Sequence, residues 1–204
     1  MNTINFQELK ASIQDWIALD YIDPKDIPAI ELYMDQVTSF MDEQLSSSKR
    51  YDDDKILTKT MINNYAKNNL LPPPVKKKYS KEHVIVMIFI YYFKTILSIK
   101  DIETILTPIT EKYFGTDSAV DVASIYEEVC NTAKGQIQNL KDEVREAYET
   151  SQNTFKDMEG LSDSDREYLQ LFSLISSLSF DVYAKKALIE RIIDELPEPV
   201  RKKK

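Results

Sequence analysis

Apolar residues recur every three or four positions through the first half of the chain, the spacing that one buried face of a helix produces. Residues with helix-capping side chains precede two of these stretches, Thr58 before one and Ser80 before the other. The stretch that begins at Lys81 is apolar on almost every side, which is typical of a helix inside a core. The pattern predicts helices over residues 6–19, 27–45, 59–68, 81–97 and 99–106.

The second half has one apolar stripe that continues from Val122 to Met158. This stripe predicts a single amphipathic helix over residues 118–158, ended by Gly160. Another helix is predicted from Ser162 to Leu196, with a break near residues 180–181. A helix this long cannot bury its stripe against a small domain, so it needs a partner helix. The stripe either packs within the chain or forms a dimer interface, and we expect a mixture of the two.

These elements predict an all-α protein with a minor β-wing, divided into two parts. Residues 1–115 form the first domain, which includes an extra helix at its start, and residues 116–196 form a helical hairpin for dimerisation. The wing is the extended, basic segment Val75–Tyr79, which follows three prolines that cannot continue a helix. Residues 197–204 end in Arg-Lys-Lys-Lys and are expected to be a disordered basic tail.

Composition agrees with this picture. Hydrophobic residues make up 43% of the 204 residues, and only three are Gly, whereas strand-rich folds use many Gly in their turns. The most apolar run, Val84–Phe93, is far shorter than the roughly 20 residues that cross a bilayer. The single cysteine cannot form an internal disulfide, and the first residues do not resemble a secretory signal. We therefore expect a cytoplasmic protein with no membrane partner.

Charge is unevenly distributed along the chain. The net charge is −8, which by itself argues against a nucleic-acid partner. Residues 49–81 differ, because they contain nine basic and three acidic residues, a net charge of +6, and leave −14 on the rest. Phosphates respond mainly to nearby charge, since the screening length at physiological salt is about 8 Å. A local basic surface on an acidic protein is therefore compatible with DNA binding.

The order of sequence features from Ile56 to Leu106 is more informative about function than any single residue within that stretch. A short polar helix stops at Leu70-Leu71-Pro72-Pro73, a basic segment ends in Tyr79-Ser80, and a long apolar helix then leads to a helix that begins at Ser98. This order resembles the winged helix-turn-helix of the MerR family, in which a recognition helix, a short basic wing and a long helix follow one another. The first half of the chain also resembles an uncharacterised bacterial family, domain of unknown function 1836.

The resemblance implies that the helix over residues 58–68 enters the major groove of double-stranded DNA while the wing over residues 75–79 contacts phosphates. The side chains suit both tasks, because Asn reads adenine edges and Lys binds guanine or phosphate. Met61, Ile62 and Tyr65 have the spacing to anchor this helix from beneath. The predicted DNA contacts are Lys59, Thr60, Asn63, Asn64, Lys67, Lys76, Lys77, Lys78 and Tyr79.

We therefore expect a DNA-binding transcriptional regulator that acts as a homodimer. The alternative is a helical protein–protein interaction module with a winged-helix shape that no longer binds DNA. The net charge of −8 favours the alternative, as does the presence of Asn and Lys where the MerR family has Arg. The segment between Leu45 and Thr58 is also much longer than the usual helix-turn-helix turn of about 3–4 residues.

Signatures of catalysis are missing, so we expect that the protein is not an enzyme and uses no cofactor. The sequence has no Gly-rich phosphate loop, and one His with one Cys cannot supply a zinc site. His83 is expected to be a structural or surface residue, and Asp52-Asp53-Asp54 to be a disordered acidic loop rather than a calcium site. Four tyrosines of the second half either pack as core, which we favour, or bind a small-molecule effector. They are Tyr126, Tyr148, Tyr168 and Tyr183.

Overall fold

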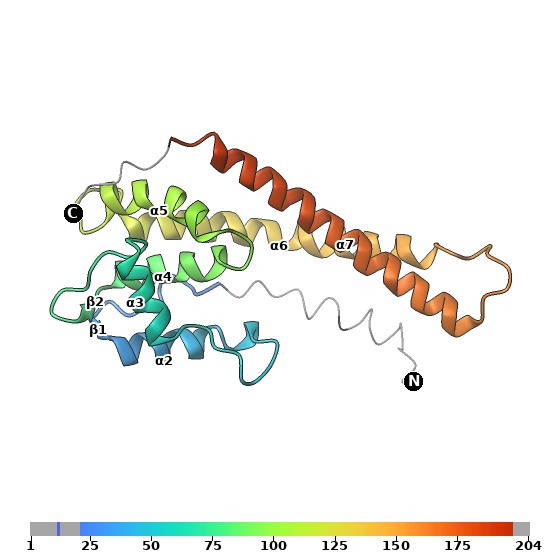
Figure 1. Cartoon of the computed structure of the whole chain (residues 1–204), viewed down its shortest axis with the longest axis horizontal. Coiled ribbons are helices and arrows are strands. Elements are labelled where there is room, and N and C mark those ends of the chain that lie inside the picture. Colours follow the sequence, from blue (N-terminus) through green and yellow to red (C-terminus); the bar gives the residue numbers. More distant parts are fainter. Residues whose placement is uncertain (1–11, 13–20, 198–204) are drawn as a thin grey trace. The chain divides into compact units, whose positions relative to one another are not determined.

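The computed structural model describes residue 12 and residues 21–197, and helices make up most of that part of the chain (Figure 1). A mainly helical chain with a small sheet is thereby confirmed. The α-helices are α2 (Met34–Gln44), α3 (Lys59–Lys67), α4 (Lys81–Phe93), α5 (Ile99–Tyr113), α6 (Val122–Gln152) and α7 (Asp163–Asp194). The strands are β1 (Leu32–Tyr33) and β2 (Lys78–Tyr79), and a 3₁₀ helix, η1 (Ser46–Ser48), follows α2. The predicted helix over residues 6–19 and residues 198–204 of the predicted tail lie outside the described residues.

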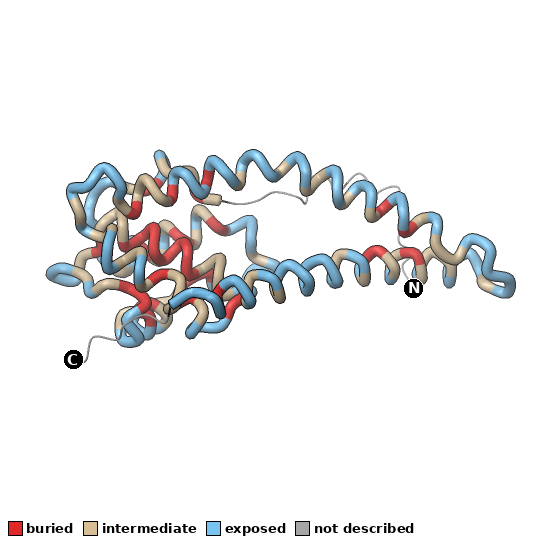
Figure 2. The backbone as a smooth tube through the Cα atoms, turned by 90° about the horizontal axis from the view of Figure 1, so that it is seen from above, coloured by how far each residue is buried: buried red, intermediate tan, exposed pale blue. Residues whose placement is uncertain are grey.

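The chain divides into two compact units, and the described part of the first, the core unit, consists of residues 21–131 and 189–197. Its core forms around α4, in which every side chain from His83 to Ile90 is buried (Figure 2). The prediction that this apolar stretch is the core helix is confirmed. The helix ends at Phe93, earlier than predicted, because the chain turns there and Ser98 begins α5 by accepting a hydrogen bond from the Asp101 amide at 3.2 Å.

The first turns of α6 belong to the same core. Val122, Tyr126 and Cys130 are buried, and the Tyr126 ring meets the Phe89 ring edge-on at a centroid distance of 5.5 Å. The Tyr126 hydroxyl donates a hydrogen bond of 2.6 Å to the carbonyl oxygen of Ile22. Burial raises the pKa of the Tyr126 hydroxyl, which therefore stays protonated and able to donate. This bond ties the start of the described segment to α6.

Replacing Tyr126 with Phe is expected to lower the free energy of unfolding by about 1–2 kcal/mol, because the Ile22 carbonyl loses its donor inside the core. Urea denaturation followed by circular dichroism measures the change. Tyr168→Phe is the matched control, since Tyr168 is 66% exposed and should change stability by less than about 0.5 kcal/mol. Equal effects of the two substitutions would show that the Tyr126 hydroxyl bond is not stabilising.

The two strands form a small antiparallel sheet that joins distant segments. Leu32 pairs with Tyr79, and Tyr33 pairs with Lys78. The prediction of a helix from residue 27 is wrong at its start, because β2 holds residues 32–33 in an extended conformation. α2 begins only after Tyr33, whose backbone amide donates a 2.8 Å hydrogen bond to the side chain of Gln36. The sheet therefore places the start of α2 beside the wing.

The sequence predicted a helix that ends at residue 106, but α5 continues through Pro108 to Tyr113. Pro108 has no backbone N–H, so α5 lacks the hydrogen bond that residue 108 would otherwise donate to the Thr104 carbonyl, but the helix continues without it. The predicted break near residues 180–181 is also wrong, because α7 is continuous from Asp163 to Asp194.

The second unit, the hairpin unit, consists in its described part mainly of residues 132–188, which form two long helices joined by a loop (Figure 1). α6 ends at Gln152 rather than near residue 158, and Phe155 follows in a left-handed conformation with φ 57°. The Arg166 guanidinium holds the loop by donating to the carbonyls of Lys156 at 2.8 Å and Met158 at 3.1 Å. No helix in the described part of the chain has a stretch long and apolar enough to cross a membrane.

Candidate nucleic-acid interface

Helix α3 presents a polar outer face above an apolar base. Thr58 begins it by accepting a 3.2 Å hydrogen bond from the Met61 amide through its side-chain oxygen. Ile62 and Tyr65 are buried, as predicted for anchors, and Met61 is partly buried against the core. All the predicted contacts on this helix are exposed, namely Lys59, Thr60, Asn63, Asn64 and Lys67. The helix therefore has the two-sided form that the sequence predicted.

The stop of α3 comes from Asn69 and not from the prolines. Asn69 adopts a left-handed conformation with φ 60°, which Asn tolerates better than most residues. The amides of Leu70 and Leu71 then donate back to the Tyr65 carbonyl, at 2.9 Å and 3.3 Å, and close the end of the helix. Because α3 already ends at Lys67, the prolines direct the chain that follows it instead of interrupting it.

The predicted wing is a tight turn that leads into β2. Val75 and Lys78 form a bridge, and the Lys78 amide donates a 2.9 Å hydrogen bond to the Val75 carbonyl. The two residues between them, Lys76 and Lys77, both have positive φ, 50° and 65°. Two left-handed central residues define a type I′ hairpin turn, in which Asn-Gly is the preferred pair. The turn is therefore strained by its own sequence, at about 1–2 kcal/mol for each lysine.

The location of Lys76 and Lys77 indicates a functional reason for their strained backbone conformation. Both side chains are exposed at the tip of the turn. Within the described part of the chain, no ion pair is formed by Lys76, Lys77 or Lys67. Backbone strain is concentrated at functional sites more often than elsewhere. The turn thus exposes two unpaired positive charges at a position where other residues would be more stable.

A short segment, residues 31–35, carries two carboxylates that pair with a lysine of α3 and a lysine of the wing. Lys59 forms an ion pair with Asp35, and Lys78 lies 3.5 Å from the Glu31 carboxylate. The Lys78 ammonium also lies 5.7 Å from the centre of the Tyr33 ring, within range of a cation–π contact. This segment therefore contacts both α3 and β2, and it neutralises two predicted DNA-contacting lysines. The strand in this segment was not predicted from the sequence, although the alternation of apolar and polar residues from Ile30 to Tyr33 is a signal for a strand.

Tyr79, the last predicted DNA contact, lies beneath the surface. Its side chain is only 3% exposed, and its ring meets the His83 ring edge-on at 5.6 Å. Pairing of β2 with β1 turns the Tyr79 side chain inward, so the phenol belongs to the core that supports the wing. Tyr79 is therefore not part of the candidate interface. Lys78 is half-buried and paired, so the exposed part of the wing is the turn itself.

His83 links the wing to the segment after α3, so of the two expected roles, structural or surface, it has the structural one. Its ring is 3% exposed, and Nδ1 accepts a 3.0 Å hydrogen bond from the Ser80 amide. Nε2 faces the Pro73 carbonyl at 3.4 Å, so the neutral ring protonated on Nε2 satisfies both partners. The Phe114 ring packs edge-on at 4.7 Å on its other side. Burial lowers the pKa of His83, and the backbone contacts to Pro73 and Pro72 and the charge of Glu31 oppose that shift.

Because burial lowers the pKa of His83, we expect the protein to lose stability in mild acid. The unfolded chain binds a proton on His83 below a pKa of about 6.5, whereas the folded chain resists protonation because its pKa is lowered. Stability should therefore fall as the pH decreases from about 6.5 towards the folded pKa, by at most about 1.4 kcal/mol per pH unit. Denaturation midpoints between pH 7 and pH 5.5 measure it, and the signal is assignable because the chain has one His. A stability that is constant or rises over that range would contradict the assignment.

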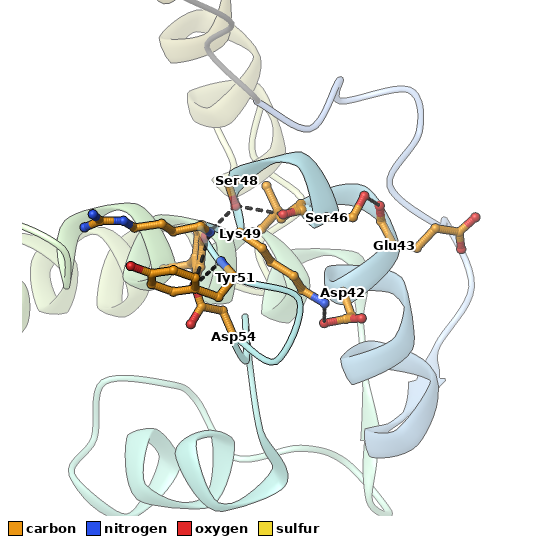
Figure 3. A network of polar contacts seen from close by, with 10 residues as sticks. Asp42, Glu43, Ser46, Ser48, Lys49, Tyr51 and Asp54 are labelled. Atoms are coloured by element: carbon orange, nitrogen blue, oxygen red, sulfur yellow. Dashed lines mark hydrogen bonds and ion pairs between the residues drawn. The ribbon is translucent and has the colours of Figure 1, made fainter. Parts of the chain in front are cut away.

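The loop between α2 and α3 is ordered by its own polar groups (Figure 3). Lys49 forms a 2.7 Å ion pair with Asp42, and the Ser48 hydroxyl donates to the Leu45 carbonyl at 2.7 Å. The Asp54 carboxylate accepts hydrogen bonds from the amides of Arg50 and Tyr51, at 3.1 Å and 3.0 Å. The prediction that residues 52–54 form a disordered acidic loop is therefore wrong at Asp54, because the Asp54 carboxylate closes a turn. The described part of the chain contains no cluster of His, Cys, Asp and Glu able to hold a metal ion.

The four tyrosines do not share one environment. Tyr126 is buried in the core unit, and Tyr148 is buried in the hairpin unit. Tyr168 and Tyr183, by contrast, are 66% and 71% exposed. The two buried tyrosines thus have the packing role that we favoured, and the two exposed ones remain open to a partner.

Comparison with known proteins places the chain in a family without assigning it an activity. No curated protein and no solved structure matches the chain. The model of one family, described as a domain of unknown function (DUF1836), matches residues 22–129. That match covers more than half of the chain and includes α3, the wing and all the residues of the candidate interface. The protein therefore belongs to the DUF1836 family.

Proposed function

We propose that the protein is a DNA-binding transcriptional regulator, with α3 in the major groove and the turn of residues 76–77 on the phosphate backbone. The observation that carries the proposal is the strained turn, which holds two exposed and unpaired lysines at a position that favours Asn-Gly. Phosphate contacts position a protein on the duplex without reading its sequence. Lys76 and Lys77 suit that role because long side chains with single positive charges reach phosphates.

The outer face of α3 suits base reading. Asn63 and Asn64 are exposed between Lys59 and Lys67, above the buried Ile62. Asn side chains make paired hydrogen bonds to adenine in the major groove. The succession of α3, the basic turn, α4 and α5 is the order on which the resemblance to the winged helix-turn-helix rests, and it supports this proposal. The ion pair between Lys59 and Asp35 is exposed on both sides, so phosphate can replace Asp35 at little cost.

The proposal includes a homodimer, because one short helix reads few base pairs. Two copies would present their α3 helices to successive major grooves about 34 Å apart, or at a multiple of that spacing. In the described part of the chain, α7 exposes several large apolar side chains, among them Tyr168, Phe172 and Ile175, which suit a contact between two copies. Analytical ultracentrifugation of the full chain with and without duplex DNA measures the state that binds.

Salt dependence of DNA binding is the direct test. If each protomer neutralises about four phosphates, the logarithm of the binding constant of a dimer should fall against the logarithm of salt with a slope of about −7. Fluorescence anisotropy of a labelled duplex of mixed sequence, titrated at several salt concentrations, gives this slope. A flat response, or the absence of binding at low salt, would refute the proposal.

A protein–protein interaction module is the second candidate, and one observation favours it. Glu31, Asp35 and Asp42 pair with three lysines of the basic segment, so that its net charge of +6 is partly neutralised within the fold. An interface of mixed charge suits a protein partner better than it suits a polyanion. The same titration separates the candidates, because this function predicts no salt-dependent binding to duplex DNA.

A further inference from the structure

The small sheet of the core unit has a buried face and an outer face. Leu32 and Tyr79, which pair with each other, are both buried. Because successive side chains of a strand point to opposite faces, the neighbouring pair of Tyr33 and Lys78 lies on the outer face. Val75 is bridged to Lys78 from the other side, so its side chain shares that face. The outer sheet face therefore consists of Tyr33, Lys78 and Val75, and its two apolar members are 55% and 63% exposed.

The outer sheet face lies between the turn of residues 76–77 and the start of α3. Lys78 follows the turn directly. Asp35, two residues after Tyr33, forms an ion pair with Lys59, which is the first residue of α3. A duplex that contacts both α3 and the turn therefore has its backbone beside Tyr33. The sequence did not predict Tyr33 as a DNA contact, because only the pairing of β1 with β2 brings it beside the wing.

The charges around Tyr33 cancel, which favours an uncharged contact at this position. The Glu31 carboxylate lies 3.5 Å from the Lys78 ammonium, and Asp35 pairs with Lys59, so both lysines beside Tyr33 are matched by a carboxylate. The Tyr33 phenol is neutral and can donate a hydrogen bond to a phosphate oxygen, as Tyr side chains do in protein–DNA contacts. The Lys78 ammonium, 5.7 Å from the centre of the Tyr33 ring, favours a ring position on the outer sheet face.

We propose that the Tyr33 hydroxyl donates a hydrogen bond to a phosphate of duplex DNA between α3 and the turn, and that Val75 packs on the adjoining sugar. This inference rests on the proposed function and adds a positioning residue to it. A neutral donor contributes affinity without releasing a counterion from the duplex. Loss of the Tyr33 hydroxyl therefore weakens binding equally at every salt concentration, whereas loss of a lysine contact also flattens the salt dependence.

Anisotropy titrations of a labelled duplex of mixed sequence with the full-length Tyr33→Phe variant, at several salt concentrations, test the proposal. Loss of one hydrogen bond weakens binding by about three- to tenfold for each protomer, so the binding constant of a dimer should fall by about ten- to a hundredfold while its salt slope stays the same. Lys77→Ala is the comparison, because it should flatten the slope of a dimer by about 2. The matched control is Tyr51→Phe, which removes a hydroxyl from a tyrosine that is 59% exposed outside the outer sheet face and should leave binding unchanged. Urea denaturation checks that all variants are folded.

Three outcomes would overturn the proposal. A binding constant that Tyr33→Phe leaves unchanged would remove Tyr33 from the DNA contacts and leave the outer sheet face to a protein partner. Equal losses in Tyr33→Phe and Tyr51→Phe would show that the effect is not specific to this face. A slope flattened as much as in Lys77→Ala would show that the substitution acts through the lysines. In each of these cases the unmodified protein still binds DNA, whereas failure of the unmodified protein to bind would refute the proposed function itself.

Discussion

Replacing Lys76 with Asn and Lys77 with Gly is expected to stabilise the protein while weakening its binding to DNA. Both lysines have left-handed backbone conformations, and Asn-Gly is the pair that such a turn prefers. After allowance for the greater chain entropy of Gly in the unfolded state, the gain should be about 1 kcal/mol. The same change removes two unpaired positive charges from each protomer. The slope of the salt dependence of a dimer should therefore change from about −7 to about −4.

Two measurements on one variant make this prediction decisive. Urea denaturation reports the free energy of unfolding, and anisotropy titrations at several salt concentrations report the slope. The control is Lys112→Ala/Lys156→Ala, which removes the same charge from two exposed positions outside the interface and should leave the slope near its original value. A stabilised variant with unchanged DNA binding would remove the turn from the interface. A destabilised variant would show that the lysines are not strained.

Replacing Ile62 with Ala is expected to lower the free energy of unfolding by about 2–5 kcal/mol, because the side chain is fully buried beneath α3 and its loss leaves a cavity. Its neighbour Asn63 is exposed, so Asn63→Ala should change stability by less than about 0.5 kcal/mol. The two substitutions therefore separate the base of the helix from its outer face. In DNA binding, Asn63→Ala should relax sequence preference and leave the salt slope unchanged.

Denaturation measures the first effect, and selection from a random duplex library measures the second. Ile62→Val is the matched control for packing, with an expected cost of about 0.5–1.5 kcal/mol because it removes only one methyl group. If Asn63→Ala selected the same sequences as the unmodified protein, Asn63 would not read bases. If Ile62→Ala were neutral, α3 would not be anchored as the fold indicates.

The starts of α3, α4 and α5 could be predicted from short stretches of sequence. Thr58 and Ser98 accept hydrogen bonds from amides three residues later in the chain, so their effect is local and readable. The apolar run after Ser80 likewise had to be buried, because no arrangement can expose so many large side chains to water at low cost. The exposed face of α3 follows from the same argument, since its polar residues alternate with buried ones in the helical period.

The ends of α5 and α6 could not be predicted from the local pattern of residues. The helix that starts after Ser98 was expected to end at residue 106, yet α5 continues through Pro108 to Tyr113. Phe155 looked like part of one long stripe, yet it takes a left-handed conformation in a loop whose carbonyls accept hydrogen bonds from Arg166. Local propensity is a weak preference that tertiary packing overrides at a cost of about 1 kcal/mol or less for most residues.

For the candidate interface, the sequence by itself determined which residues are polar, where the basic segment lies and which side chains must anchor α3. Only the tertiary structure decided which of the positive charges are available. Pairing of β1 with β2 brings Glu31 and Asp35 to Lys78 and Lys59, turns Tyr79 inward, and leaves Lys76 and Lys77 at a strained turn. The physical reason is that strand pairing joins segments more than forty residues apart in the sequence. A charge is neutralised by the groups that the fold places beside it, and these need not be its neighbours in the chain.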